Sequence, residues 1–236
     1  MASHEGLIHL HCGDAAAAVH WRSGLPGALQ VWRDSPAVGP WTHDPAHLPA
    51  LRMAWWGVTG AEVRGLGSPQ NPARAPEPVL WFGPNPWEQA CLLWVLASLP
   101  GDTLPDLVPL DHSAGQMPPT ALPPLFAQRI LLGEEALTAA RVLWARFLED
   151  GWGPLGGSGV PGLPWLAQAL ARLAEDHPAQ GPGRTRRQLQ ALVDRGVLDL
   201  PTLMMELRRL EDPHHGAWYG DLYIAKMVDA MGVRLG

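Results

Sequence analysis

The sequence predicts an α/β fold, in which a Rossmann-like N-terminal domain with a parallel sheet precedes a helical, winged-helix-like C-terminal domain. Two observations predict it. Short apolar runs alternate with helix-like segments over the first half of the chain, and three helix-like stretches follow Arg184. We expect the Rossmann-like domain over residues 1–125, a helical connector over 126–180 and the C-terminal domain over 181–236.

Four short apolar runs are the expected strands: Leu7–His11, Ala28–Trp32, Val79–Phe82 and Asp106–Leu110. Three of them lead into helix-like segments, and strands that alternate with helices are joined by crossover connections. Crossovers join parallel strands, so the four runs should form one parallel sheet. The carboxyl ends of its strands would then meet at one edge.

The segment "VLWFGPNPWEQ" carries the clearest helix start of the chain. Asn85 can be the N-cap, Pro86 fits the first helical position, and Glu88 stands three residues after the cap, as in a capping box. The apolar residues that follow run to Pro100–Gly101, which should end this helix.

Other helix starts carry weaker signals. Asp14 can cap the alanine-rich segment after the first strand, and Thr42 or Asp44 can cap the segment after the second, with Pro49 near its start. Further helices are expected over Glu134–Asp150, Trp165–Glu175, Arg184–Arg195, Leu200–Leu210 (capped by Asp199) and Asp221–Met231 (capped by Asp221), with loops over Gly65–Pro78 and Gly151–Pro164.

Composition and charge exclude several classes of protein. Hydrophobic residues make up 47% of the chain, no apolar run approaches the roughly 18 residues that span a membrane, and the N-terminus lacks a signal-peptide pattern. The two cysteines, Cys12 and Cys91, make no disulfide framework, so a cytoplasmic location is expected. From Arg184 onward eight Lys and Arg stand against seven Asp and Glu, which leaves nine against sixteen before it and predicts no strong affinity for nucleic acid.

A ligand site is expected at the carboxyl ends of the strands, where open parallel sheets bind their ligands. The polar residues there are Asp14, Arg33, Asp34, Asn85, Gln89 and Asp111. Each side chain also has a purely structural interpretation: Asp14 and Asn85 as helix caps, and Asp34 in a turn where Arg33 pairs with it. Neither GxGxxG nor a Walker-type phosphate loop occurs in the chain.

The segment "HLHC" offers side chains that zinc accepts, because His9 and His11 share one face of a strand. Cys12 faces the other way unless the chain turns, and no second His/Cys pair completes the set. A buried or edge-lining histidine pair is therefore favoured over a metal centre, and no metal site is predicted. For the same reason Cys12 and His11 make a weak nucleophile–base pair. No cofactor can be named from the sequence.

Five segments carry a resemblance to a known family: "IHLHCGDAA", "LQVWRDSPAVGP", "VLWFGPNPWEQACLLWVL", "RTRRQLQALV" and "WYGDLYIAKMVDAM". In this order they resemble the bacterial proteins grouped as domain of unknown function 1835. The resemblance implies a Rossmann-like N-terminal domain and a helical C-terminal part, but no established activity. It also implies acidic side chains at the positions of Val38, Gly83 and Asn85, and their absence here argues against inherited metal binding or catalysis.

Two functions are consistent with these residues. The favoured one is a non-catalytic ligand-binding or regulatory protein that holds a small polar or anionic ligand at the strand ends. The alternative is an enzyme acting on a phosphorylated or nucleotide-like substrate through Asp14, Asp34 and Asp111, with Arg33 as an anion clamp. Carboxylates within about 5 Å of one another would favour the enzyme, and side chains engaged in caps and turns would favour the binding protein.

The C-terminal helices raise a separate question about partners. For DNA reading, Asp221–Met231 would be the recognition helix, yet Lys226 is its one base against Asp221 and Asp229. Contact with another protein, or packing within the chain, is therefore preferred to DNA binding. No membrane contact is expected.

Overall fold

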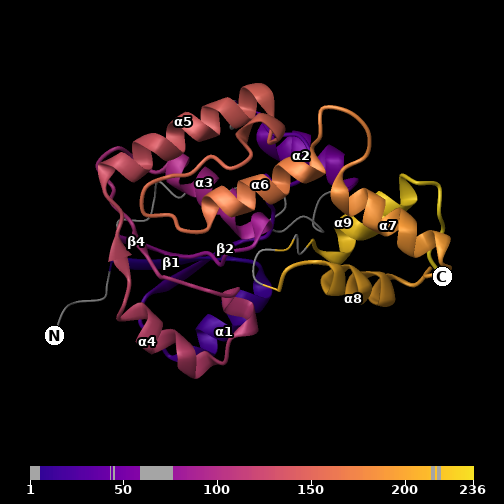
Figure 1. Cartoon of the computed structure of the whole chain (residues 1–236). Helices are drawn as coiled ribbons and strands as arrows, with labels where there is room; N and C mark the ends of the chain where they lie inside the picture. Colours follow the sequence, from indigo (N-terminus) through magenta and orange to yellow (C-terminus); the bar gives the residue numbers. More distant parts are fainter. Residues whose placement is uncertain (1–5, 43, 45, 59–76, 214–215, 217–218) are drawn as a thin grey trace.

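The computed structural model of the chain describes residues 6–42, 44, 46–58, 77–213, 216 and 219–236. Its centre is a sheet of order β2-β1-β3-β4-β5, in which the first four strands are parallel and β5 runs antiparallel to β4. Helices cover both faces of the sheet, and the last three helices lie together at one end of the molecule (Figure 1). The chain is an α/β protein with a mostly parallel sheet.

The strands are β1 (Leu7–Cys12), β2 (Ala28–Trp32), β3 (Glu77–Trp81), β4 (Asp106–Leu107) and β5 (Ile130–Leu131). The first four confirm the expected strands. β4 is shorter than expected because Pro109 has no N–H for the ladder, although the Val108 N–H still donates to the Leu80 carbonyl at 3.0 Å. β5 was not expected, since two residues are too few to show an alternating pattern.

The helices are α1 (Asp14–Ser23), α2 (Leu48–Trp56), α3 (Pro86–Ser98), α4 (Leu122–Phe126), α5 (Glu134–Asp150), α6 (Leu166–Asp176), α7 (Arg184–Asp194), α8 (Leu200–Leu210) and α9 (Asp221–Asp229). All the expected helices are present, and only the short α4 was not anticipated. The expected loop over Gly65–Pro78 lies outside the described residues, apart from its last two positions.

Two expected helix caps are confirmed. The Asn85 side chain caps α3 by accepting a hydrogen bond from the Glu88 N–H at 3.0 Å, and Pro86 is the first helical residue. Asp199 caps α8 in the same way, accepting from the Thr202 N–H at 2.9 Å. Both caps follow from chemistry within four residues of the chain.

The other expected caps are wrong. Asp14 and Asp221 are the first residues inside α1 and α9, where a carboxylate complements the helix dipole, and the glycine before each is the N-cap. Neither helix has a side-chain cap. At α2 the N-cap is His47, because Asp44 instead closes a turn by accepting from the Ala46 N–H at 2.8 Å, and Thr42 accepts from the Asp44 N–H.

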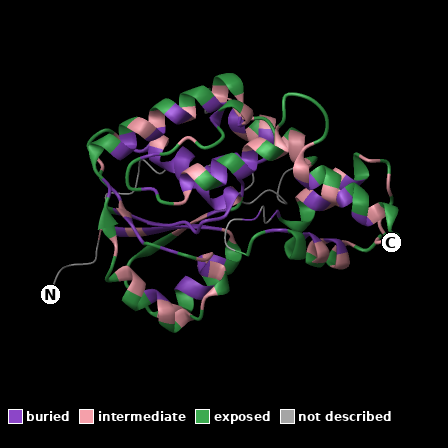
Figure 2. Ribbon diagram, in the orientation of Figure 1, coloured by how far each residue is buried: buried purple, intermediate pink, exposed green. Residues whose placement is uncertain are grey.

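The sheet separates two buried apolar clusters, visible as purple segments on both sides of the strands (Figure 2). The larger cluster lies between the sheet, α3, α5 and α6 and continues into α7–α9. The smaller lies between the sheet, α1 and the segment 114–126. Successive residues of β1 alternate between them, so Leu10 and Cys12 belong to the larger cluster, while His9 and His11 face Trp81 in the smaller.

The C-terminal helices are fixed to the body by a buried polar network. Arg172 of α6 donates to both carboxylate oxygens of Glu211, at 3.0 and 2.9 Å, and to the Thr185 hydroxyl at 2.8 Å. The Tyr219 hydroxyl donates to Asp176 at 2.6 Å. No strand occurs among the described residues of 181–236, so this part of the chain is helical. No helix in the described ranges is long and apolar enough to cross a membrane.

Candidate functional site

Because β2, β1, β3 and β4 are parallel, their carboxyl ends lie at one edge of the sheet. The expected site residues all follow these ends. Asp14 follows β1, the pair Arg33–Asp34 follows β2, and Asp111 follows β4, while Asn85 and Gln89 stand at the start of α3 after β3. Their side chains, however, are engaged with different partners and do not form one cluster of carboxylates.

Asp34 is buried in an ion pair that the sequence did not reveal. Arg52 of α2 donates two parallel hydrogen bonds to the Asp34 carboxylate, from Nε to Oδ2 at 2.8 Å and from Nη2 to Oδ1 at 2.6 Å. Oδ1 also accepts from the Trp56 indole at 3.1 Å and from the Ser35 N–H at 2.9 Å. The side chains of Asp34 and Arg52 are 6% and 0% exposed, so a ligand in solution does not reach this pair.

The surroundings of Arg52 complete its hydrogen bonding. Its Nη1 donates to the carbonyls of Val38 and Pro40, and the guanidinium lies 4.7 Å from the ring centroid of Trp55. Gly39 adopts a positive φ of 71° against this group, and a Cβ there would lie 2.5 Å from the Trp55 ring. The loop after β2 is therefore wrapped around a fixed arginine, and Asp34 serves to hold it.

Asp14 and Arg33 form the exposed counterpart of that pair. The Arg33 guanidinium donates from Nε to both carboxylate oxygens of Asp14, at 2.8 and 3.0 Å, and Nη2 lies 2.7 Å from Oδ1. The side chains are 37% and 69% exposed. The expected pairing of Arg33 with Asp34 is wrong, because neighbours at the end of a strand point to opposite sides.

The start of α3 is a closed hydrogen-bond unit. The Glu88 carboxylate accepts from the Gly83 N–H at 2.6 Å and from the Asn85 amide at 2.8 Å, and the Ser113 side chain also bonds to it. Burial raises the pKa of Glu88 above its ordinary value. Gln89 donates from Nε2 to the Gly83 carbonyl at 2.7 Å. Asn85 and Gln89 are buried in this unit, so neither presents its amide to solvent.

Between the ends of β1 and β3, the strand-end edge where a ligand site was expected is covered by the chain itself. A Cβ on Gly83 would lie 2.8 Å from the His112 carbonyl oxygen. A Cβ on Gly115 would lie 3.0 Å from the Cβ of Ala15. The segment 112–117 therefore spans from the end of β3 to the first turn of α1. In the 2-1-3-4 strand order, ligands bind at this switch point. Asp111 directly precedes this segment, and its Oδ1 lies 3.0 Å from His112 Nδ1.

Three histidines pack together beside Trp81 in the smaller cluster, with His20 tilted against His9 and edge-on to His11. His9 donates from Nε2 to the Pro26 carbonyl at 2.9 Å and accepts from the Trp81 indole at 3.0 Å, which fits a neutral ring. His11 Nε2 lies 2.9 Å from His20 Nδ1. Burial lowers the pKa of all three, that of His20 to about 4. Among the described residues, no group of three or more His, Cys, Asp or Glu side chains is arranged to hold a metal ion.

The two thiols meet on the opposite face of the sheet. Cys12 Sγ lies 3.6 Å from Cys91 Sγ, and the Cys91 thiol points at the Asp34 carbonyl at 3.3 Å. The hydrogen bond between the two thiols and the burial of Cys12 raise the pKa of Cys12 well above its ordinary value. Because His11 lies across the sheet and the thiol stays protonated, Cys12 is not an activated nucleophile.

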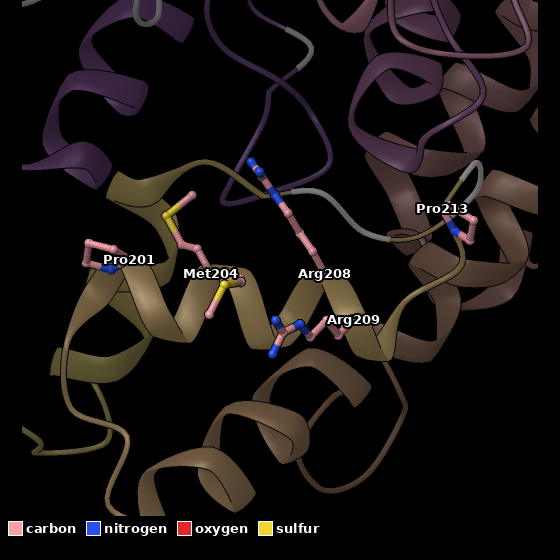
Figure 3. A pocket seen from close by; sticks show the side chains of 6 residues that line it. Pro201, Met204, Arg208, Arg209 and Pro213 are labelled. Atoms are coloured by element: carbon pink, nitrogen blue, oxygen red, sulfur yellow. The ribbon is translucent and has the colours of Figure 1, made fainter.

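The C-terminal helices present a shallow hollow of about 520 Å³ on α8. Its lining consists of Pro201, Met204, Met205, Arg208, Arg209 and Pro213. The two arginine side chains leave α8 in different directions, so they do not converge on one anion (Figure 3). Lys226 of α9 lies 5.3 Å from the ring centroid of Trp55, which turns this cation of the expected DNA-reading helix towards α2.

The roles of three residues at this edge and near it were not predicted from the sequence. Arg52 is the one charged residue of the apolar helix α2. Because a buried charge needs a partner, the sequence could have indicated that Arg52 pairs with an acidic residue. His20 lies on the same face of α1 as Ala16, so its burial was also readable. The contact of Glu88 with Ser113 joins distant segments and has no local signal.

No protein-family model matches the chain, and a search of curated proteins finds no match either. What the site can bind is therefore inferred from its geometry. The exposed Asp14–Arg33 pair is the part of the expected site that faces solvent at the ends of β1 and β2.

Proposed function

We propose that this chain is a non-catalytic ligand-binding or regulatory protein that holds a small polar or anionic ligand at the ends of β1 and β2. Arg33 supplies a planar set of donors for a carboxylate or phosphate group. Asp14 supplies acceptors for a hydroxyl or amine group of the same ligand. Solvent reaches both side chains, which a ligand site requires.

One observation supports this proposal most strongly: three of the other polar side chains at the strand ends, those of Asp34, Asn85 and Gln89, are buried and bond within the protein. Asp34 bonds to Arg52, the Asn85 amide bonds to Glu88, and Gln89 donates from Nε2 to the Gly83 carbonyl. A general acid or base has to reach the substrate within hydrogen-bond distance. A carboxylate that is buried against a guanidinium does not meet that condition.

The alternative enzyme would act on a phosphorylated or nucleotide-like substrate through Asp14, Asp34 and Asp111. It needs these three carboxylates on one ligand. Asp34 bonds inward to Arg52, whereas Asp14 bonds to Arg33 and Asp111 to His112 at the surface. The geometry therefore favours the binding protein over the enzyme.

We further propose the finer classification of the fold. The 2-1-3-4 order of parallel strands is a doubly wound arrangement, which supports a Rossmann-like class. The succession of α7, α8 and α9 supports a winged-helix-like class for residues 181–236, with 1–125 and 126–180 as the preceding domain and connector. The free thiols support a cytoplasmic location.

Membership of the family grouped as domain of unknown function 1835, and with it a bacterial origin, is also a proposal. The close approach at Gly83 supports one of its consequences. An acidic side chain at this position would collide with the backbone of His112 and Ser113. The segment 112–117 and a carboxylate at position 83 therefore exclude each other, which is consistent with a member that has exchanged a catalytic or metal-binding group for a closed edge.

For the C-terminal helices we propose contact with protein rather than DNA. The hollow on α8 combines two methionines with two arginines, and methionine side chains adapt to different apolar partners. α9 buries Ile224 and Val228 and directs Lys226 towards Trp55. This leaves α9 poorly equipped to read base edges.

A thermal-shift screen tests the proposed ligand site. The panel contains inorganic phosphate, AMP, glucose 6-phosphate and glutamate, and a ligand at 100 times its dissociation constant should stabilise the fold by about 2.7 kcal/mol. We expect at least one member to raise the melting temperature of the wild type, and Arg33→Met to abolish this response while melting normally without ligand.

Arg22→Met is the matched control, because Arg22 is an exposed arginine of α1 that bonds the Ala18 carbonyl of its own helix. It should keep the response. Absence of any response in the wild type would contradict a site for these ligands. Conversion of AMP or glucose 6-phosphate to free phosphate, followed by NMR of phosphorus and lost in Asp14→Asn, would favour the enzyme instead.

A further inference from the structure

A small cavity lies beside the ends of β3 and β4. Its volume is about 50 Å³, and its walls come from the end of β3, α3, the β4 segment and residues 163–165. Apart from the Gln89 amide and the Trp165 indole, the lining side chains are apolar. Ile130 stands at the rim and is 46% exposed, so the cavity lies close to solvent.

Gln89 lines this cavity and carries an unused hydrogen-bond acceptor. The residue is 2% exposed, and its Oε1 has no hydrogen-bond partner within the described part of the chain. The orientation of the amide is fixed, because Nε2 donates to the Gly83 carbonyl at 2.7 Å and a flipped amide would set two oxygens against each other. The free position is therefore an acceptor, and a buried acceptor without a donor is costly.

The other polar group of the lining is already satisfied. The Trp165 indole donates to the Leu110 carbonyl at 2.7 Å, which holds the ring as one wall of the cavity. No charged side chain contributes to the lining. An occupant must then be neutral, carry one O–H or N–H donor for Gln89, and otherwise be apolar.

The volume limits the size of the occupant. A cavity of about 150 Å³ accommodates benzene, so about 50 Å³ accommodates two or three non-hydrogen atoms. We propose that this cavity is a binding site for the hydroxyl-bearing end of a small neutral alcohol, with Gln89 Oε1 accepting the hydroxyl proton. The site is separate from the Asp14–Arg33 surface and does not depend on it.

Ethanol and acetonitrile are matched probes for this site, because each has three non-hydrogen atoms and only ethanol has a donor. Both are titrated into the full chain labelled with nitrogen-15, and the side-chain amide of Gln89 and the indole N–H of Trp165 are followed by NMR. Trp165→Phe identifies the indole signal. Ethanol should shift both signals with a saturable curve, with a dissociation constant no tighter than about 0.5 mM.

Two variants locate the response. Gln89→Leu removes the acceptor, and Val108→Ile fills the cavity while leaving Gln89 in place. Both should abolish the saturable shift of the Trp165 indole. The matched control is Gln190→Leu, which makes the same substitution on α7, where Gln190 bonds Asp194 at the surface. It should bind ethanol like the wild type.

The expected result is saturable binding of ethanol, at least ten-fold weaker binding of acetonitrile, and loss of ethanol binding in Val108→Ile as well as Gln89→Leu. Equal binding of the two probes would overturn the role of the hydroxyl donor. A shift that grows linearly with ethanol, or that persists in Val108→Ile, would overturn the site and leave the cavity to ordered water.

Discussion

Two aspartate–arginine pairs stand at the end of β2, and adjacent residues of the chain belong to different pairs. Arg33 reaches out to Asp14 at the surface, while Asp34 turns inward to Arg52. Both pairs have short bidentate contacts, yet the inner side chains are 6% and 0% exposed and the outer ones 37% and 69%. The comparison separates a structural use of the same chemistry from one that is open to a ligand.

The difference teaches that contact geometry alone does not identify a functional site. The inner pair is surrounded by tryptophans and backbone carbonyls that satisfy the guanidinium, so removing one partner leaves a buried charge. The outer pair is already hydrated, so a ligand group can replace one partner at little cost. Exposure, rather than distance, assigns the two pairs to different roles.

The largest expected effect breaks the inner pair. Arg52→Met leaves the Asp34 carboxylate buried without its counter-charge, and we expect the free energy of unfolding in urea to fall by about 3–5 kcal/mol. The matched substitution in the outer pair, Arg33→Met, should change it by less than about 1 kcal/mol.

The double variant Asp34→Asn/Arg52→Met removes both charges and should recover part of the lost stability, because an amide keeps an oxygen for the Trp56 indole and the Ser35 N–H. Equal losses in Arg52→Met and Arg33→Met would remove the distinction between the two pairs.

The second largest effect is a pH dependence of stability, because three histidines are buried without a counter-charge among the described residues, unlike Asp34 and Arg52. Burial lowers the pKa of His9, His11 and His20 below 6.5, that of His20 to about 4. The unfolded chain binds protons below pH 6.5 while the folded chain does not, so stability should fall as the pH drops from 6.5 towards 4. Between pH 6.5 and about 4, His20 contributes up to about 1.4 kcal/mol per pH unit, and His9 and His11 change the stability in the same direction.

Glu88 opposes this trend, since its raised pKa makes the folded state bind its proton earlier on acidification, above its ordinary value of 4.5. One carboxyl group does not offset three histidines over the whole range. Urea unfolding measured at several pH values tests the sum, and His20→Asn should make the dependence less steep. Stability that is constant from pH 6.5 to 4 would contradict neutral, buried histidines.

The smallest effect concerns the cap of α3. Asn85→Ala removes the acceptor for the Glu88 N–H and should cost about 1 kcal/mol by urea unfolding. Asp199→Ala at α8 has the same local chemistry in an exposed position and serves as the comparison. A smaller loss at Asn85 than at Asp199 would mean that the contact of Asn85 with Glu88 adds nothing to the cap.

Sequence alone predicted what depends on neighbouring residues. The four strands, the helix over Glu134–Asp150 and the Asn85 cap follow from periodicity and from groups within one turn of each other. The separation of His11 from Cys12 also followed, because alternation along a strand is a local rule. The same alternation sends Arg33 and Asp34 to different partners, so their expected pairing was wrong.

Partners that come from distant segments were beyond such rules. Asp34 bonds to Arg52, which lies eighteen positions further along the chain. The segment 112–117 contacts Gly83 and Ala15, which the sheet brings together from distant parts of the chain. Glycine at position 83 is compatible with many local conformations, so its close contact with Ser113 has no signature in the sequence. The edge at which the strand ends meet was predictable, whereas its closure between β1 and β3 was not.

The central claim is that Arg33, and not the buried Arg52, meets the ligand. The most direct measurement follows the Nε–H signals of these two arginines by NMR while phosphate, AMP, glucose 6-phosphate or glutamate is added. We expect a saturable shift of the Arg33 signal with at least one of them and no change at Arg52. Movement of the Arg52 or Trp56 signals with Arg33 unchanged, or no movement with any ligand, would contradict the account.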